Sequence, residues 1–135
     1  MILVDTSVWI ELLNGRLARG LHPDDLLHFA TCSPILQEVL QGLRRHPASM
    51  AERDALLALP RLSDPLAWDR FAEASDIYRN GRRRGLTIRS SFDCLIAAVA
   101  IHHRVPVWHR DRDFLAIASF PGHEAIERFP ESSIH

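Results

Sequence analysis

The 135-residue sequence contains no lysine, so arginine supplies all 16 of its basic side chains. It also contains no glycine-rich phosphate-binding loop, in which a lysine contacts the phosphates of a nucleotide. Its two cysteines, Cys32 and Cys94, have neither the number of a disulfide framework nor the spacing of a thiolate zinc site. These absences argue against a hydrolase of small phosphorylated metabolites and against a zinc domain, and they favour buried free thiols in a reducing compartment.

Long apolar runs are absent as well. The longest, from Cys94 to Ile101, is far shorter than the roughly 20 residues of a membrane-spanning helix. No basic segment followed by an apolar one opens the chain, as a secretory leader would. With 16 basic and 17 acidic side chains, the net charge is near zero, so nucleic-acid binding requires a local basic patch. We expect a soluble, cytoplasmic, single domain over residues 1–135.

The apolar pattern predicts that strands and helices alternate along the chain. Ile2, Leu3 and Val4 form an apolar run that is too short for a helix and indicates a buried strand. Further strands are predicted at 26–31, near 62, at 105–108 and at 125–129. Helices are predicted at 8–14, 33–45, 50–59, 64–81, 90–103 and 112–117. This alternation predicts an α/β fold with a parallel sheet covered on both faces.

Acidic residues stand where these apolar elements begin or end. Asp5 follows the first strand, Glu38 borders the apolar face of its helix, and Asp93 lies in the first turn of another. Asp111 and Asp113 open the last short helix. Because strand ends and helix starts converge on one edge of a parallel sheet, we expect these carboxylates to meet there. Clustered carboxylates stay charged only with a cation, and oxygen ligands favour Mg²⁺ or Mn²⁺.

Each acidic residue also has a purely structural alternative. The alternatives are a helix cap for Asp5, Asp93, Asp111 or Asp113, and an ion pair with Arg44 or Arg45 for Glu38. Taken one at a time, the structural roles are favoured. Their coincidence at positions that one sheet edge would unite favours a metal site instead.

One stretch of the chain is strongly basic. Arg82, Arg83 and Arg84 lie between two glycines, and Arg89 precedes the helix that carries Asp93. We expect an exposed loop, which is either a solvated surface or a set of contacts to RNA phosphates.

Four segments, in order, resemble the signature segments of PIN-domain ribonucleases, and among them the VapC-type toxins of bacterial toxin–antitoxin pairs. They are VDTSVWI at the start, SPILQEVLQG, RSSFDCLIAAVA and, near the end, HRDRDF. The resemblance implies a three-layer α/β/α sandwich with a central, mostly parallel sheet. It also implies a Mg²⁺- or Mn²⁺-dependent endoribonuclease, a homodimer, and an antitoxin whose C-terminal segment covers the active site.

The resemblance also assigns site residues. Asp5, Glu38 and Asp93 match acidic positions of the family, and the fourth is matched by Asp111, with Asp113 close enough to share its role. Thr6 and Ser7 match hydroxyl-bearing positions beside the first aspartate. Which of Asp111 and Asp113 binds the metal directly is left open, and His109-Arg110 departs from the hydroxyl or amide residue of many relatives.

We therefore predict that Asp5, Glu38, Asp93 and Asp111 hold one or two ions that activate water for attack on an RNA phosphodiester. Two alternatives use the same residues. One is a metal-dependent phosphatase of a small phosphorylated metabolite, and the other is an inactive domain that binds RNA or a protein partner. The lack of a GxSxG segment argues against a serine hydrolase.

Overall fold

The computed structural model describes residues 1–13, 23–43 and 47–119. At its centre is a parallel sheet with strand order β2-β1-β3, formed by β1 (Ile2–Val4), β2 (Phe29–Ala30) and β3 (Val107–Trp108). Leu3 pairs with Ala30 on one side and with Val107 on the other. The Asp5 amide donates to the Trp108 carbonyl over 2.9 Å, so β1 and β3 end side by side.

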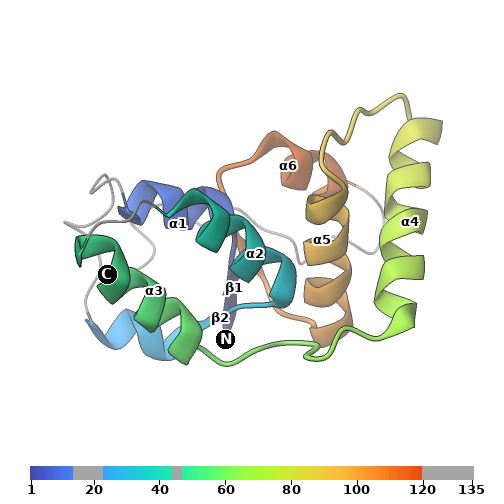
Figure 1. Ribbon diagram of the computed structural model, residues 1–135. Coiled ribbons are helices and arrows are strands. Elements are labelled where there is room, and N and C mark those ends of the chain that lie inside the picture. Colours follow the sequence, from blue (N-terminus) through green and yellow to red (C-terminus); the bar gives the residue numbers. More distant parts are fainter. Residues whose placement is uncertain (14–22, 44–46, 120–135) are drawn as a thin grey trace.

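Helices cover both faces of this sheet (Figure 1). On one side lie α1 (Thr6–Leu13), α2 (Ser33–Gly42) and α3 (Pro47–Ala58). On the other lies α5 (Ser91–His103), with α4 (Trp68–Arg83) packed outside it. The short helix α6 (Arg112–Ala118) contacts α5 and follows β3. This is the parallel α/β sandwich that the sequence predicts.

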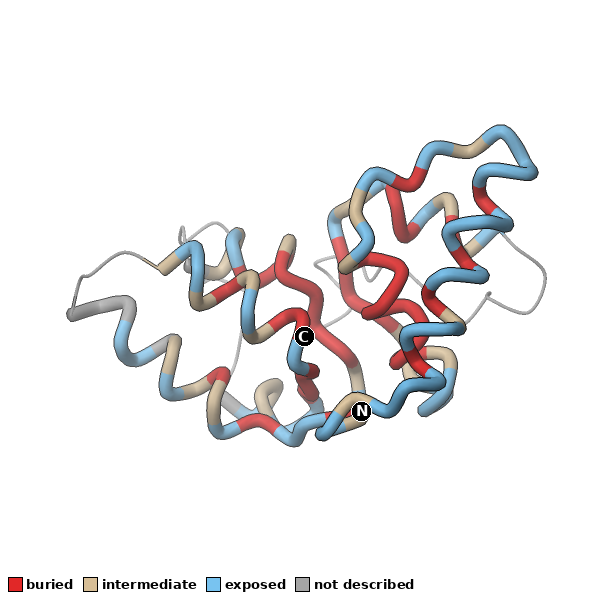
Figure 2. Tube along the Cα trace, turned by 45° about the vertical axis from the view of Figure 1, so that its right-hand side comes forward, coloured by how far each residue is buried: buried red, intermediate tan, exposed pale blue. Residues whose placement is uncertain are grey.

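The core is centred on the sheet and α5 (Figure 2). Leu3 and Val4 are fully buried, and every residue from Asp93 to Ala100 is buried. Three alanines in this stretch let α5 pack closely against its neighbours. Both cysteines are buried free thiols, as predicted. Within the described residues, no helix combines the length and apolar character needed to cross a membrane.

The second predicted strand is wrong over most of its length. Residues 26–28 belong to a 3-10 helix, η1 (Pro23–His28), and only Phe29 and Ala30 pair with β1. The strand expected near residue 62 is a single bridge between Thr31 and Arg61. The strand predicted at 125–129 lies outside the described residues.

The boundaries of several predicted helices are also wrong. The helix predicted at 33–45 is α2, which ends at Gly42, and Cys32 takes its N-cap position without a side-chain hydrogen bond. Helix α4 begins at Trp68 instead of Asp64 and continues through Arg83. Gly81, at the predicted end of this helix, is buried within it.

The large apolar residues of α4 are not all in the core. Trp68 and Phe71 are 87% and 51% exposed. The buried residues of α4 are Arg70, Ala74, Ile77 and Gly81. The side chain of Arg70 is held within 2.9 Å of the Glu73 carboxylate, and this pairing lets a charged residue face the core.

We predict that Ile96→Ala destabilises the protein by about 2–5 kcal/mol, because it opens a cavity at a fully buried position of α5. The matched control is Leu115→Ala on α6, where half of the side chain is exposed and the expected loss is about 1 kcal/mol or less. Urea denaturation of the three proteins measures both values. Equal losses would contradict the burial of α5.

Candidate active site

Asp5 lies where β1 ends and α1 begins, and it is 2% exposed. Its Oδ2 atom accepts hydrogen bonds from the amide of Ser7 at 3.0 Å and from its hydroxyl at 2.5 Å. The Ser7 hydroxyl in turn accepts a bond from the Arg110 amide at 3.0 Å. Asp5 therefore does cap α1, as its structural alternative proposed, but only one of its two oxygens is used for this purpose.

Glu38 reaches the same place from α2. Its Oε1 atom accepts a hydrogen bond from the Thr6 hydroxyl at 3.0 Å. This bond joins the start of α1 to the middle of α2 and fixes the direction of the Glu38 carboxylate. The described residues show no ion pair from Glu38 to an arginine; Arg44 and Arg45, its predicted alternative partners, lie outside them.

Asp93 lies in the first turn of α5 and is 4% exposed. The cap of α5 is Ser90, whose hydroxyl accepts a bond from the Asp93 amide at 3.4 Å. The Ser90 amide, which a capping box would pair with the Asp93 side chain, donates to Asp113 instead. Because Ser90 provides the cap, the Asp93 side chain is left for another role.

Asp111 and Asp113 follow β3 at the start of α6. Asp111 is the cap of this helix: its Oδ1 atom accepts a bond from the Asp113 amide at 2.8 Å. The amide of Asp111 donates to Nδ1 of the fully buried His109 over 3.3 Å, and that ring packs on Phe114 with centroids 5.0 Å apart. His109 therefore fixes the backbone behind Asp111, a role that the sequence did not suggest.

The structure brings these acidic residues together as predicted. Oxygen atoms of Asp5, Glu38 and Asp93 lie within 4.8 Å of one another, and so do oxygen atoms of Asp93, Asp111 and Asp113. Asp93 belongs to both groups. Two buried oxygens, Oδ1 of Asp5 and Oδ2 of Asp93, accept no hydrogen bond from the described residues. A buried carboxylate oxygen without a donor is costly, and a divalent cation with oxygen ligands would satisfy both.

The crowding changes the acidity of three of these groups. Burial raises the pKa of Asp5, and the bonds from Ser7 and Thr6 only partly oppose it. Burial also raises the pKa of Glu38. The pKa of Asp93 rises to about 9, first because of burial, then because of a hydrogen bond with the Asp113 carboxyl group, and then because of the neighbouring negative charges. These shifts show that the metal-free site favours protons in place of negative charge.

The predicted basic residues lie mostly in a helix and not in a loop, and Arg89 is the one with a recorded contact to the carboxylate cluster. Arg82 and Arg83 form the last turn of α4, and Arg84 is its C-cap. All three are exposed, as is Arg89. The Arg89 side chain lies 3.8 Å from Oδ1 of Asp113, which connects the basic segment to the carboxylates.

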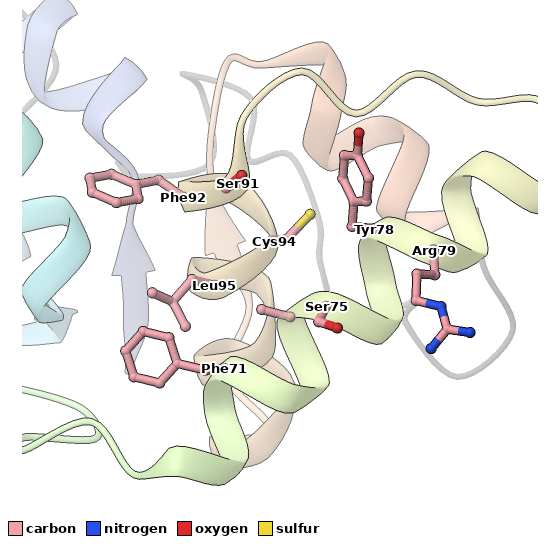
Figure 3. Close-up of a pocket in the computed structure, with 9 residues that line it drawn as sticks. Phe71, Ser75, Tyr78, Arg79, Ser91, Phe92, Cys94 and Leu95 are labelled. Carbon is pink, nitrogen blue, oxygen red and sulfur yellow. The ribbon is translucent and has the colours of Figure 1, made fainter.

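An apolar groove of about 410 Å³ lies between α4 and α5 (Figure 3). Phe71, Ser75 and Tyr78 line it from α4, and Phe92 and Leu95 line it from α5. It contains none of the acidic residues. The sequence pattern did not predict this groove, because helical periodicity does not say which part of a helix surface its neighbours leave uncovered.

Comparisons with known proteins agree with this geometry. The PIN domain model matches residues 2–119. The chain is 41% identical over 124 residues to VapC ribonuclease Mb1587 of Mycobacterium bovis, covering 87% of this chain and 92% of that protein. Ribonuclease VapC11 of Mycobacterium tuberculosis matches with the same identity and coverage.

Two solved structures share the fold. FitAcB from Neisseria gonorrhoeae aligns with a TM-score of 0.59 at 20% identity, covering 87% of this chain and 93% of that one. PAE2754 from Pyrobaculum aerophilum aligns with a TM-score of 0.51 at 24% identity, covering 86% and 84%. At such identities these likenesses establish the architecture alone.

We predict that the metal-free protein becomes less stable as the pH rises from about 5 to about 8. In this window the folded state keeps a proton on Asp93, whose pKa is raised from 3.8 to about 9, whereas the unfolded chain has released it. The folded state binds more protons, so its free energy of unfolding falls with rising pH. Thermal melts in EDTA measure the trend.

The matched control for this trend is Asp93→Asn. Asparagine cannot take part in the titration, while every other titrating group, including the histidines, stays the same in both proteins. The fall in melting temperature with pH should therefore be smaller in the variant. Parallel curves for the two proteins would show that Asp93 does not hold a proton in this range.

Proposed function

The chain belongs to the PIN domain family, and from this premise we propose that it is a Mg²⁺- or Mn²⁺-dependent endoribonuclease, the toxin of a toxin–antitoxin pair. Relatives at 41% identity over most of the chain bear the name VapC ribonuclease. The acidic residues that the family resemblance selects are also the ones that the fold brings within reach of one another. Sequence and geometry therefore support the same activity.

We propose that Asp5, Glu38, Asp93 and Asp111 hold the metal. The observation that carries this proposal is the pair of buried oxygens on Asp5 and Asp93 that accept no hydrogen bond from the described residues. The donor set contains only carboxylate and hydroxyl oxygens, which suits a hard divalent ion and does not suit zinc. The residues present thus fit the proposed ion.

When bound, a divalent ion supplies positive charge for the phosphate and lowers the pKa of water. The protein's part is to hold its carboxylates ready. Ser7 orients Asp5, Thr6 orients Glu38, and Ser90 fixes the first turn from which Asp93 projects. Because these bonds already fix the directions of the carboxylates, little rearrangement is needed to form the site.

We propose that the exposed arginines at the end of α4, together with Arg89 beside the site, bind the RNA backbone. Arg82, Arg83 and Arg84 end α4, and Arg89 lies next to the carboxylates. Arginine binds phosphate oxygens through paired hydrogen bonds, and such contacts position a nucleic acid without reading its sequence. A local patch of this kind is required because the net charge of the chain is only −1.

We predict that the purified protein, freed of any partner, cleaves RNA with Mg²⁺ or Mn²⁺ and is inactive in EDTA. Asp5→Asn should lower the cleavage rate by about 100-fold or more, as the loss of an electrostatic stabiliser does. The matched control is Asp76→Asn, an exposed acid on α4 away from the cluster. Labelled RNA on a denaturing gel measures the rates.

The same assay separates the alternatives. Hydrolysis of a small phosphomonoester with intact RNA would support the phosphatase. RNA binding without cleavage in any divalent metal would support an inactive binding domain. Cleavage that persists in excess EDTA would rule out the metal mechanism.

We also propose that the protein works in the cytoplasm, where a cognate antitoxin restrains it, and that it forms a homodimer. The two buried free thiols suit a reducing compartment. For the dimer, the surface is the exposed stripe of α4 formed by Trp68, Phe71, Ser75 and Tyr78, which share one side of the helix. Exposed apolar patches of this kind mark interfaces.

Two copies of α4 can pack antiparallel across this stripe about a two-fold axis, which makes each contact between their aromatic side chains twice. Arg82 is not needed for these contacts, because it is engaged within its own chain: its guanidinium donates to the Tyr78 hydroxyl at 3.2 Å and lies 5.9 Å from the centre of that ring.

We predict that replacing Trp68 and Phe71 together with alanine yields a monomer at concentrations where the parent is a dimer. Both side chains are at least half exposed, so folding should be retained. The control is Leu115→Ala, which removes an equally exposed apolar residue from α6. Sedimentation equilibrium measures the state, and a double variant that remains dimeric would place the interface elsewhere.

A further inference from the structure

Asp113 uses its carboxylate differently from the other acidic residues. Its Oδ2 atom accepts two backbone hydrogen bonds, from the amides of Arg89 at 2.9 Å and Ser90 at 3.0 Å. Its Oδ1 atom lies 3.8 Å from the Arg89 guanidinium. The residue is 3% exposed and comes from α6, whereas its partners precede α5. One buried carboxylate thus ties two elements together across 23 and 24 residues of chain.

These bonds continue to two other members of the cluster. Ser90, held by Asp113, caps α5 by accepting a bond from the Asp93 amide at 3.4 Å. At its other end, the Asp113 amide donates to Oδ1 of Asp111 at 2.8 Å. A continuous chain of hydrogen bonds therefore runs from Asp111 through Asp113 and Ser90 to Asp93.

From this chain we infer that Asp113 is a positioning residue and that Asp111 is the acid at this edge that contacts the metal. The inference rests on the proposed metal site and deepens it. An oxygen that accepts two amide bonds has little capacity left for a cation, and the second oxygen faces an arginine. Asp111 has only one oxygen engaged by its own helix. Asp113 sets where Asp93 and Asp111 stand relative to each other.

A positioning residue can be told from a metal ligand by which substitution restores metal binding. Asp113→Ala removes the acceptor for both amides, so the start of α5 and with it Asp93 should shift. Asp113→Asn keeps an oxygen for the two amides and gives up only the 3.8 Å pairing with the exposed side chain of Arg89. Asn should therefore restore what Ala loses, although it cannot replace a charged metal ligand.

The experiment measures Mn²⁺ affinity by calorimetry for the parent, Asp113→Ala, Asp113→Asn and Asp111→Asn, with Asp76→Ala on α4 as control. We expect Asp113→Ala to weaken binding by about 10- to 100-fold, as loss of a residue that orients metal ligands does. Asp113→Asn should recover most of that loss. Asp111→Asn should lose at least as much Mn²⁺ affinity as Asp113→Ala, because an asparagine does not replace a charged ligand there. The control should bind Mn²⁺ as the parent does.

Each outcome decides one question. If Asp113→Asn binds Mn²⁺ as weakly as Asp111→Asn, then Asp113 is itself a ligand and the inference is wrong. If Asp113→Ala fails to fold, the comparison of the two asparagine variants still decides. If the affinities follow the expected order but the parent does not cut RNA, the positioning role stands and the proposed function fails. A parent that binds no Mn²⁺ overturns both.

Discussion

The burial of several carboxylates side by side at one edge of a parallel sheet is the constraint on which the rest of this site depends. The strands β1 and β3 end side by side, and α2 and α5 bring Glu38 and Asp93 to the same edge. Without a cation these groups cannot all be ionised, and burial raises the pKa of Asp93 to about 9. The fold therefore holds in place a set of charges that only a bound cation would make favourable.

The neighbouring hydroxyl and amide groups make this arrangement possible, although they do not remove the cost of burying several negative charges together. Ser7 and Thr6 donate to Asp5 and Glu38, and Ser90 takes over the cap that Asp93 could have formed. Each bond satisfies one oxygen and leaves another available. Helix capping and metal binding are thus compatible roles for one carboxylate, because its two oxygens can be used separately.

Much of this could be predicted from the sequence, since apolar runs and the acidic residues at their ends are local signals. The first strand, the helix of Asp93 and the meeting of the acidic residues all follow from such signals. The exposure of Trp68 could not be predicted in this way, because helical periodicity identifies an apolar stripe but does not say which neighbouring element covers it. Nor could spacing separate Asp111 from Asp113, which differ only in the backbone groups that tertiary contacts bring to them.

The stability of α5 explains how the site can hold an unfavourable charge. From Asp93 to Ala100 every residue of the helix is buried, and all but Asp93 are apolar. The burial of that apolar surface stabilises the folded protein by far more than the burial of one carboxylate destabilises it. The position of Asp93 is therefore set by packing on one side and by the Ser90 cap on the other, and neither depends on the metal. The packing of α5 thus offsets the cost of burying the Asp93 carboxylate. A bound ion would then stabilise the protein through its contacts with the carboxylates, without having to fold the helix that holds Asp93.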